Sequence, residues 1–205
     1  MSVLVGQVAP FFHDASKSFA AVQGDGKIVE NFSFQKAAAG QYAVVFFYPL
    51  DFTFVCPSEL IAFNNRLKAF QDRNTVVLGI SLDSHFTHAA WRNTSIEKGG
   101  VGSLGYTMVS DIKREIIQAY DVESPNGVAF RGSFLIDKAG IVQHQVVNNL
   151  PLGRNVDEML RMVDALQFSE KHGEVCPAGW QKGNEGMKPN ADGVATYLAK
   201  HAKSL

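Results

Sequence analysis

The chain is poor in cysteine, in net charge and in long apolar runs, and each shortage excludes a class of protein. Only two cysteines, Cys56 and Cys176, occur in 205 residues, which is too few for a disulfide-stapled scaffold or a cysteine-rich zinc site. The formal net charge of -1 provides no field that would attract phosphate backbones or anionic lipid. No uninterrupted apolar stretch approaches the roughly 20 residues that cross a bilayer. We therefore expect neither nucleic acid nor a membrane as a partner.

The composition indicates a folded protein. Hydrophobic residues make up 46% of the chain and charged residues 19%, whereas a disordered chain would be poorer in apolar residues. Residues 1–12 are apolar, but no cation precedes Lys17, so the basic start of a secretory signal is missing. We expect a cytoplasmic protein, in which the two cysteines are either ordinary buried thiols or redox-active ones.

Strands and helices alternate in the first half of the chain. Residues 43–48 (AVVFFY) and 75–81 (TVVLGIS) are apolar runs, typical of strands that are buried on both faces of a sheet. Between them, residues 58–72 place apolar side chains at the spacing of one helical face. Residues 85–94 predict a second helix, which completes a βαβα unit.

The pattern changes in the second half. Residues 115–120 predict a short helix, and residues 132–137 and 141–147 predict two strands of a hairpin. Asn155 opens a longer helix, with Glu158 three residues on as in a capping box. Together these elements predict an α/β sandwich with a mixed central sheet flanked by helices, not a doubly wound parallel sheet.

The C-terminal region has a different composition. Residues 171–192 are rich in Gly, Lys, Asn and Pro with little periodicity, which indicates an extended arm, and residues 194–201 predict a last helix. We expect one domain over residues 1–170 and a C-terminal arm over residues 171–205. The second cysteine, Cys176, lies in this arm.

Cys56 follows a buried strand and a turn that contains Pro49, and it precedes a predicted helix. It should therefore lie in the first helical turn, with Pro57 at a position where a missing N–H costs nothing. The unpaired backbone amides and the positive end of the helix dipole favour an anion there, so the thiol should lose its proton more easily than that of a free cysteine. On position alone, a buried structural cysteine is an equally good interpretation.

The surroundings of Cys56 are repeated near Cys176. Residues 55–57 and 175–177 both read Val-Cys-Pro. A second cysteine on a mobile arm is well placed to capture an oxidised first one. Glu59 occupies the third position after Cys56, so there is no CxxC motif and a dithiol oxidoreductase with both thiols in one turn is disfavoured.

A longer segment carries a family resemblance. Residues 46–59 (FFYPLDFTFVCPSE) closely resemble the active-site segment of the typical two-cysteine peroxiredoxins, whose pattern is Pro-x-x-x-Thr/Ser-x-x-Cys. Residues 83–91 with their Phe-Thr-His, residues 129–132 (AFRG) and residues 175–180 (VCPAGW) resemble the same family in the right order. The resemblance covers residues 5–189 and implies a thioredoxin-like fold with an extended C-terminal arm.

The resemblance also implies an antioxidant enzyme and assigns roles to residues. Such an enzyme reduces hydrogen peroxide and small organic hydroperoxides. Cys56 is then the peroxidatic cysteine, Thr53 and Arg131 orient the peroxide and stabilise the thiolate, and Pro49 shields the pocket. Cys176 is the resolving cysteine. Its thiol condenses with the Cys56 sulfenic acid to form a disulfide.

Glu59 has two interpretations. It either anchors an arginine near the active site or is a favourable carboxylate in the first turn of a helix.

The family resemblance implies partners as well. In this family the resolving thiol comes from the other subunit, so the working unit is a homodimer, and dimers commonly assemble into decameric rings of five. The sequence has no nicotinamide or flavin fingerprint, so we expect no cofactor and a separate protein as reductant. Thioredoxin is the first candidate, and a dedicated flavoprotein disulfide reductase is the second.

A ring assembly that holds unfolding clients or relays oxidation is a second class of function.

His85 and His88 lie at helical spacing, and without a nearby acidic or cysteine ligand we expect them to be surface or interface residues and assign no metal.

The sequence departs from the most peroxide-sensitive relatives at two places. Those relatives have Gly-Gly-Leu-Gly in a loop and Tyr-Phe in the last helix. This pair packs over the turn that holds the peroxidatic cysteine and slows the local unfolding of that turn. Residues 99–102 here read Gly-Gly-Val-Gly, and the last helix offers Tyr197 and Leu198. We therefore expect intermediate sensitivity to excess peroxide.

Overall fold

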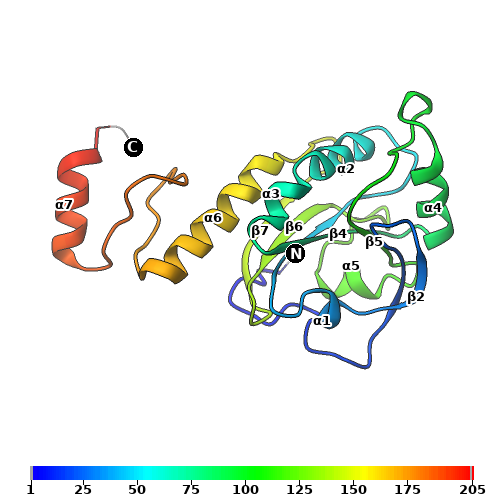
Figure 1. Cartoon of the computed structure of the whole chain (residues 1–205), viewed down its shortest axis with the longest axis horizontal. Helices are drawn as coiled ribbons and strands as arrows, with labels where there is room; N and C mark the ends of the chain where they lie inside the picture. The colour runs from blue at the N-terminus through cyan, green and yellow to red at the C-terminus, as the bar shows by residue number, and fades with distance from the viewer. Residues whose placement is uncertain (1, 204) are drawn as a thin grey trace. The chain divides into compact units, whose positions relative to one another are not determined.

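A seven-stranded sheet lies at the centre of the N-terminal part of the computed structural model, which describes residues 2–203 and 205 (Figure 1). The strand order is β2-β1-β5-β4-β3-β6-β7. β3, β4 and β5 run parallel, while the other neighbours are antiparallel, so the predicted mixed sheet is confirmed. The strands are β1 (Phe19–Val22), β2 (Ile28–Phe32), β3 (Tyr42–Phe47), β4 (Thr75–Ser81), β5 (Thr107–Ser110), β6 (Arg131–Ile136) and β7 (Val142–Asn148).

Helices cover both faces of the sheet. α2, α3 and α4 lie on one face, and α1 and α5 lie on the other (Figure 1). The helices are α1 (Phe34–Ala37), α2 (Cys56–Asn65), α3 (Leu67–Gln71), α4 (His85–Asn93), the 3₁₀ helix η1 (Ile96–Lys98), α5 (Glu115–Ala119), α6 (Val156–His172) and α7 (Ala191–His201). This is the thioredoxin-like arrangement that the resemblance implied.

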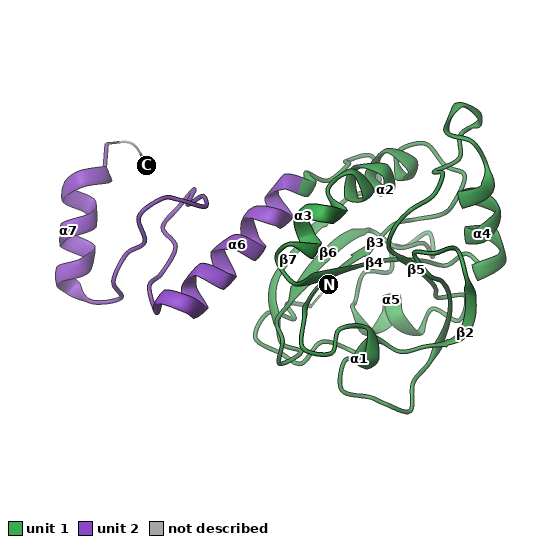
Figure 2. Ribbon diagram, viewed as in Figure 1, with its two compact units in different colours: residues 1–156 green, residues 157–205 purple. Residues whose placement is uncertain are grey.

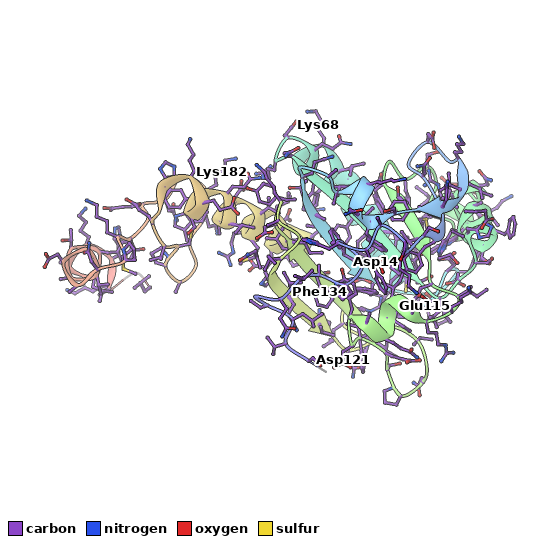
Figure 3. The ribbon with its side chains drawn as sticks, turned by 90° about the horizontal axis from the view of Figure 1, so that it is seen from below. Asp14, Lys68, Glu115, Asp121, Phe134 and Lys182 are labelled. Atoms are coloured by element: carbon purple, nitrogen blue, oxygen red, sulfur yellow. The ribbon has the colours of Figure 1, made fainter. Side chains whose placement is uncertain are left out.

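The core explains why the strand sequences are so apolar. Every residue of β3 is buried, because helices cover the sheet on both sides. On one side Phe46 stacks on Phe63 of α2, with ring centroids 4.1 Å apart. On the other side Phe47 packs edge-on against Phe134 of β6, which Figure 3 labels. The apolar run in the sequence therefore reports burial on both faces.

One predicted helix is two. Residues 58–72 were expected to form a single helix, but the backbone leaves helical geometry at Arg66, where ψ is 4°, and α3 begins at Leu67. Phe63 and Phe70 are nevertheless both fully buried. Apolar spacing reports which side chains are buried and does not detect a local break in the backbone, so the prediction of one continuous helix was wrong.

The chain divides into two compact units, residues 1–156 and residues 157–205 (Figure 2). The predicted boundary after residue 170 stays a prediction, because compactness alone does not decide which part folds as a domain. In the second unit, backbone bonds between Val175 and Met187 close a loop. Lys182, labelled in Figure 3, lies 3.2 Å from the carboxylate of Asp164. Within residues 2–203 and 205, each helix is too short or too polar to span a bilayer.

Candidate active site

Cys56 is the first residue of α2, as the sequence predicted. The chain leaves β3 at Phe47, crosses the segment 48–55 and enters the helix at this cysteine. Its thiol is 0% exposed. A sulfur atom in this position is surrounded by protein and lies at the positive end of the helix dipole, which favours an anion.

Arg131 brings a positive charge to the sulfur. It is the first residue of β6 and is buried, and its Nη1 lies 3.4 Å from Cys56 Sγ. The same nitrogen donates to Glu59 Oε2 at 2.6 Å, while Nε donates to the Leu150 carbonyl at 2.7 Å. Three partners thus fix the guanidinium. Because arginine stays protonated at all working pH values, this charge is permanent.

Glu59 binds two arginines. Besides Arg131, it receives three bonds from Arg154: the backbone amide and Nε donate to Oε1 at 2.9 and 2.8 Å, and Nη2 donates to Oε2 at 2.9 Å. Burial raises the pKa of Glu59, but the bonds from Arg154 and the charges of both arginines outweigh it and hold the pKa below its usual range. The geometry fits both interpretations made from the sequence, because Glu59 lies in the first turn of α2 and also bonds to Arg131.

Arg154 was not predicted from the sequence as a site residue. Its Nη1 donates to the carbonyls of Phe47 and Gly132, both at 2.7 Å, and its guanidinium lies over the ring of Phe46 at 5.2 Å. It therefore ties β3 and β6 to the carboxylate of Glu59 on α2. The residue lies in the loop between β7 and α6, where no periodicity or motif marks it.

Thr53 and Pro49 lie in the segment that leads to Cys56. Pro49 is buried, and Thr53 is half-buried. The Thr53 hydroxyl donates to the carbonyl of Leu50 at 2.8 Å, so the structure joins Cys56, Glu59 and Arg131 directly but not Thr53. The roles of Thr53 and Pro49 toward a peroxide stay predictions.

One histidine is not where the sequence placed it. His88 was expected at the surface or an interface, but its side chain is 0% exposed and its Nδ1 lies 2.7 Å from Asp51 Oδ2. The acidic partner was missed because it lies 37 residues away in the chain. His85 pairs with Glu30 at 3.0 Å. The described residues contain no group of three or more His, Cys, Asp or Glu side chains that could hold a metal ion.

Cys176 has a different setting, within the second unit. It is half-buried, and its Sγ donates to the carbonyl of Ala165 at 3.4 Å. Burial raises the pKa of its thiol, and the charge of Arg161 partly opposes this shift. Arg161 is itself held by Glu158 and donates to the carbonyl of Trp180 at 2.8 Å. Both cysteines are free thiols.

Known proteins resemble the chain over most of its length. Residues 5–145 match the sequence model of the AhpC/TSA family, and residues 165–200 match that of the C-terminal domain of 1-Cys peroxiredoxin. Alkyl hydroperoxide reductase C of Buchnera aphidicola subsp. Schizaphis graminum is 52% identical over 199 residues, which are 97% of this chain and 98% of the relative. Peroxiredoxin-2 of Macaca fascicularis is 46% identical over 96% of each chain. The crystal structure of reduced Plasmodium vivax 2-Cys peroxiredoxin is 48% identical, with a TM-score of 0.91 over 97% of this chain and 100% of that one.

Proposed function

The chain belongs to the AhpC/TSA family of peroxiredoxins, and on that premise we propose that Cys56 attacks the peroxide and that Cys176 resolves the product. The family makes the chain a thiol-dependent peroxidase, with a hydroperoxide as substrate and a thioredoxin-type protein as reductant. The observation that supports Cys56 most strongly is its buried position 3.4 Å from a guanidinium that Glu59 holds in place. Cys176 has no such cation bonded to its sulfur in the described part of the chain.

The first step is nucleophilic substitution at oxygen. The Cys56 thiolate attacks one oxygen of the hydroperoxide, the O–O bond breaks, and the other oxygen leaves as an alcohol or water after it takes up a proton. The sulfur keeps one oxygen as a sulfenic acid. Arg131 stabilises the thiolate and the charge that develops on the leaving oxygen. We assign Thr53 to hydrogen bonding of the peroxide and Pro49 to shielding of the pocket.

The second step forms a disulfide. The Cys176 thiolate attacks the sulfur of the sulfenic acid, and hydroxide leaves as water after protonation. A dithiol reductant then takes over the disulfide by exchange and supplies the two electrons that restore both thiols. Because Cys56 is 0% exposed, its sulfur must first leave its buried position, which requires local unfolding around the start of α2.

We propose a homodimer with intersubunit disulfides, and a decamer of five dimers. β7 is an edge strand of the sheet. Its first residue, Val142, already bonds to Gly6 and Gln7, and beyond that residue an edge of this kind favours pairing with another chain. Large apolar side chains are also exposed on the first unit: Phe54 is 97% exposed, and Phe86 and Ile112 are each 66% exposed. Phe86 and Ile112 line the same pocket, and exposed apolar surface that is grouped in this way commonly marks a protein interface.

A gel and a reconstitution assay test this assignment. Oxidised wild type should run as a covalent dimer without reductant, and a persistent monomer would favour a bridge within one subunit. Peroxide-dependent NADPH oxidation, reconstituted with thioredoxin and its reductase or with a dedicated flavoprotein reductase, should identify the reductant. We propose thioredoxin first and a cytoplasmic location.

Client holding is the weaker second function, because the relatives are named for peroxide reduction. Suppression of client aggregation by a Cys56→Ser variant separates the two functions, because client holding survives the loss of the thiol and peroxidase activity does not.

A further inference from the structure

A buried acid–base pair lies in the segment that leads to Cys56. The side chains of Asp51 and His88 are both 0% exposed, and His88 Nδ1 lies 2.7 Å from Asp51 Oδ2. The hydroxyl of Tyr48 donates to the other carboxylate oxygen, Asp51 Oδ1, at 2.8 Å. We call residues 48–55 the active-site turn. Asp51 belongs to this turn, whereas His88 belongs to α4.

The backbone of the turn is held at the same residue. The backbone amide of Asp51 donates to Asp83 Oδ2 at 2.8 Å. Asp83 lies just beyond the end of β4. Ser81 donates to the same oxygen at 2.7 Å, which fixes the Asp83 carboxylate. Asp51 is therefore held at two points: its side chain bonds to α4, and its backbone amide bonds to the loop after β4.

The held conformation is a strained one. Phe52 has a φ of 53°, in the left-handed region that a residue with a bulky side chain rarely adopts. Its ring lies 5.7 Å from the ring of Trp91, which is on α4 like His88. Strain of this kind persists only where surrounding contacts impose it. The contacts that impose it here come from α4 and from Asp83.

The charged and titratable groups that face Asp51 are few. Burial raises the pKa of its carboxyl, the bond and charge of His88 oppose that shift, and the charge of Asp83 adds to it. Tyr48, whose pKa burial raises well above its usual value, is a neutral donor. A buried carboxylate with these neighbours depends on His88 for most of its compensation, because an unpaired buried charge is costly.

We infer that the Asp51–His88 pair is a clamp that holds the active-site turn in its closed conformation and so sets how long Cys56 stays buried. The inference rests on the proposed roles of Cys56 and Cys176, and it makes Asp51 and His88 positioning residues for both steps. The closed turn keeps the sulfur beside Arg131 for attack on the peroxide. The open turn is needed for the disulfide. A weaker clamp must therefore slow the first step and accelerate the second.

Stopped-flow tryptophan fluorescence of the full-length protein with hydrogen peroxide tests this opposite effect. The first phase depends on peroxide concentration and reports attack, while the second does not and reports disulfide formation. In Asp51→Asn and His88→Ala we expect the first rate constant to fall at least fivefold and the second to rise at least twofold. His88→Asn, which restores an N–H donor, should recover part of both changes. Sulfinic acid on Cys56, measured by mass spectrometry, should decrease in parallel.

Matched controls keep the result interpretable. Asp111→Asn makes the same change in another buried carboxylate, which accepts bonds from the amides of Ile116 and Ile117, and it should move neither phase. If the larger changes unfold the protein, Tyr48→Phe is a milder variant, which removes the bond to Asp51 at 2.8 Å and the longer contact with His88 Nδ1 at 3.4 Å. It leaves the Asp51–His88 bond in place and should shift both phases in the same directions by less.

Two results would overturn the clamp. The first is that both phases stay unchanged in folded Asp51→Asn and His88→Ala. The second is that both rates decline together, which indicates general damage. A wild-type protein that lacks either phase would instead refute the proposed roles of the cysteines.

Discussion

Cys56 and Cys176 share the tripeptide Val-Cys-Pro, yet their surroundings differ in charge and in burial. Cys56 is completely buried at the start of α2, with Arg131 3.4 Å from its sulfur. Cys176 is half-buried in the loop after α6, and its sulfur donates to a backbone carbonyl. A carbonyl partner stabilises a protonated thiol, whereas a guanidinium stabilises a thiolate. The same adjacent residues therefore occur in two different surroundings, and we expect those surroundings to set the reactivity of each cysteine.

The test of this contrast with the largest expected effect removes each sulfur in turn. Cys56→Ser should abolish peroxide consumption, because the nucleophile is lost. Cys176→Ser should consume about one peroxide per subunit and stop at the sulfenic acid, which has no internal thiol to condense with. Peroxide consumption and trapping of the sulfenic acid with an external thiol measure both outcomes. Full turnover by Cys56→Ser would refute the contrast.

The next test weakens the cation beside Cys56. Arg131→Lys keeps the charge but loses the planar fork that bonds Cys56, Glu59 and Leu150 together. We expect the second-order rate constant with peroxide to fall more than tenfold, which corresponds to about 1.4 kcal/mol. Stopped-flow measurement under pseudo-first-order conditions gives this constant. An unchanged value would mean that another cation, such as Arg154, serves the sulfur.

A third test concerns the pKa of Cys176. Burial raises it and Arg161 lowers it, so Arg161→Gln should raise it further. Less thiolate is then present at pH 7, and we expect disulfide formation to slow by about threefold, the effect of roughly half a pKa unit. The difference should shrink as the pH rises above the pKa, because both proteins become thiolates. Arg161→Lys is the control that keeps the charge.

The pH profile of the second fluorescence phase decides this third test. A slowing by the same factor at every pH would instead indicate that Arg161 acts only by holding the carbonyl of Trp180.

The smallest expected effect lies in the last helix, α7, which is far from Cys56 in sequence. Leu198 of α7 is partly exposed, and Leu198→Phe should increase formation of sulfinic acid roughly twofold, the lower end of about 0.5–1.5 kcal/mol for added aromatic packing. Truncation before Val194 should decrease it. Mass spectrometry of Cys56 after graded peroxide during turnover measures both. Equal yields in the two variants and the wild type would exclude α7 from control of the turn.

Much of the fold could be predicted because its signals are local. The bounds of β4 coincide with the predicted strand at residues 75–81, and α6 begins at Val156, directly after the predicted cap Asn155. By contrast β1, β2 and β5 have four or five residues each, too few for a clear alternation. Their place in the sheet depends on pairing with strands elsewhere in the chain.

The sequence by itself determined that Cys56 starts a helix, because an apolar strand, a proline turn and a helical apolar spacing follow one another directly in the chain. Only the tertiary structure decided which side chains surround it. Arg154 bonds Glu59 across 95 residues, and His88 reaches Asp51 across 37. Periodicity reports which face of an element is buried, since that depends on neighbours three or four residues away. A bond between distant residues depends on the path of the whole chain, so no local pattern contains it.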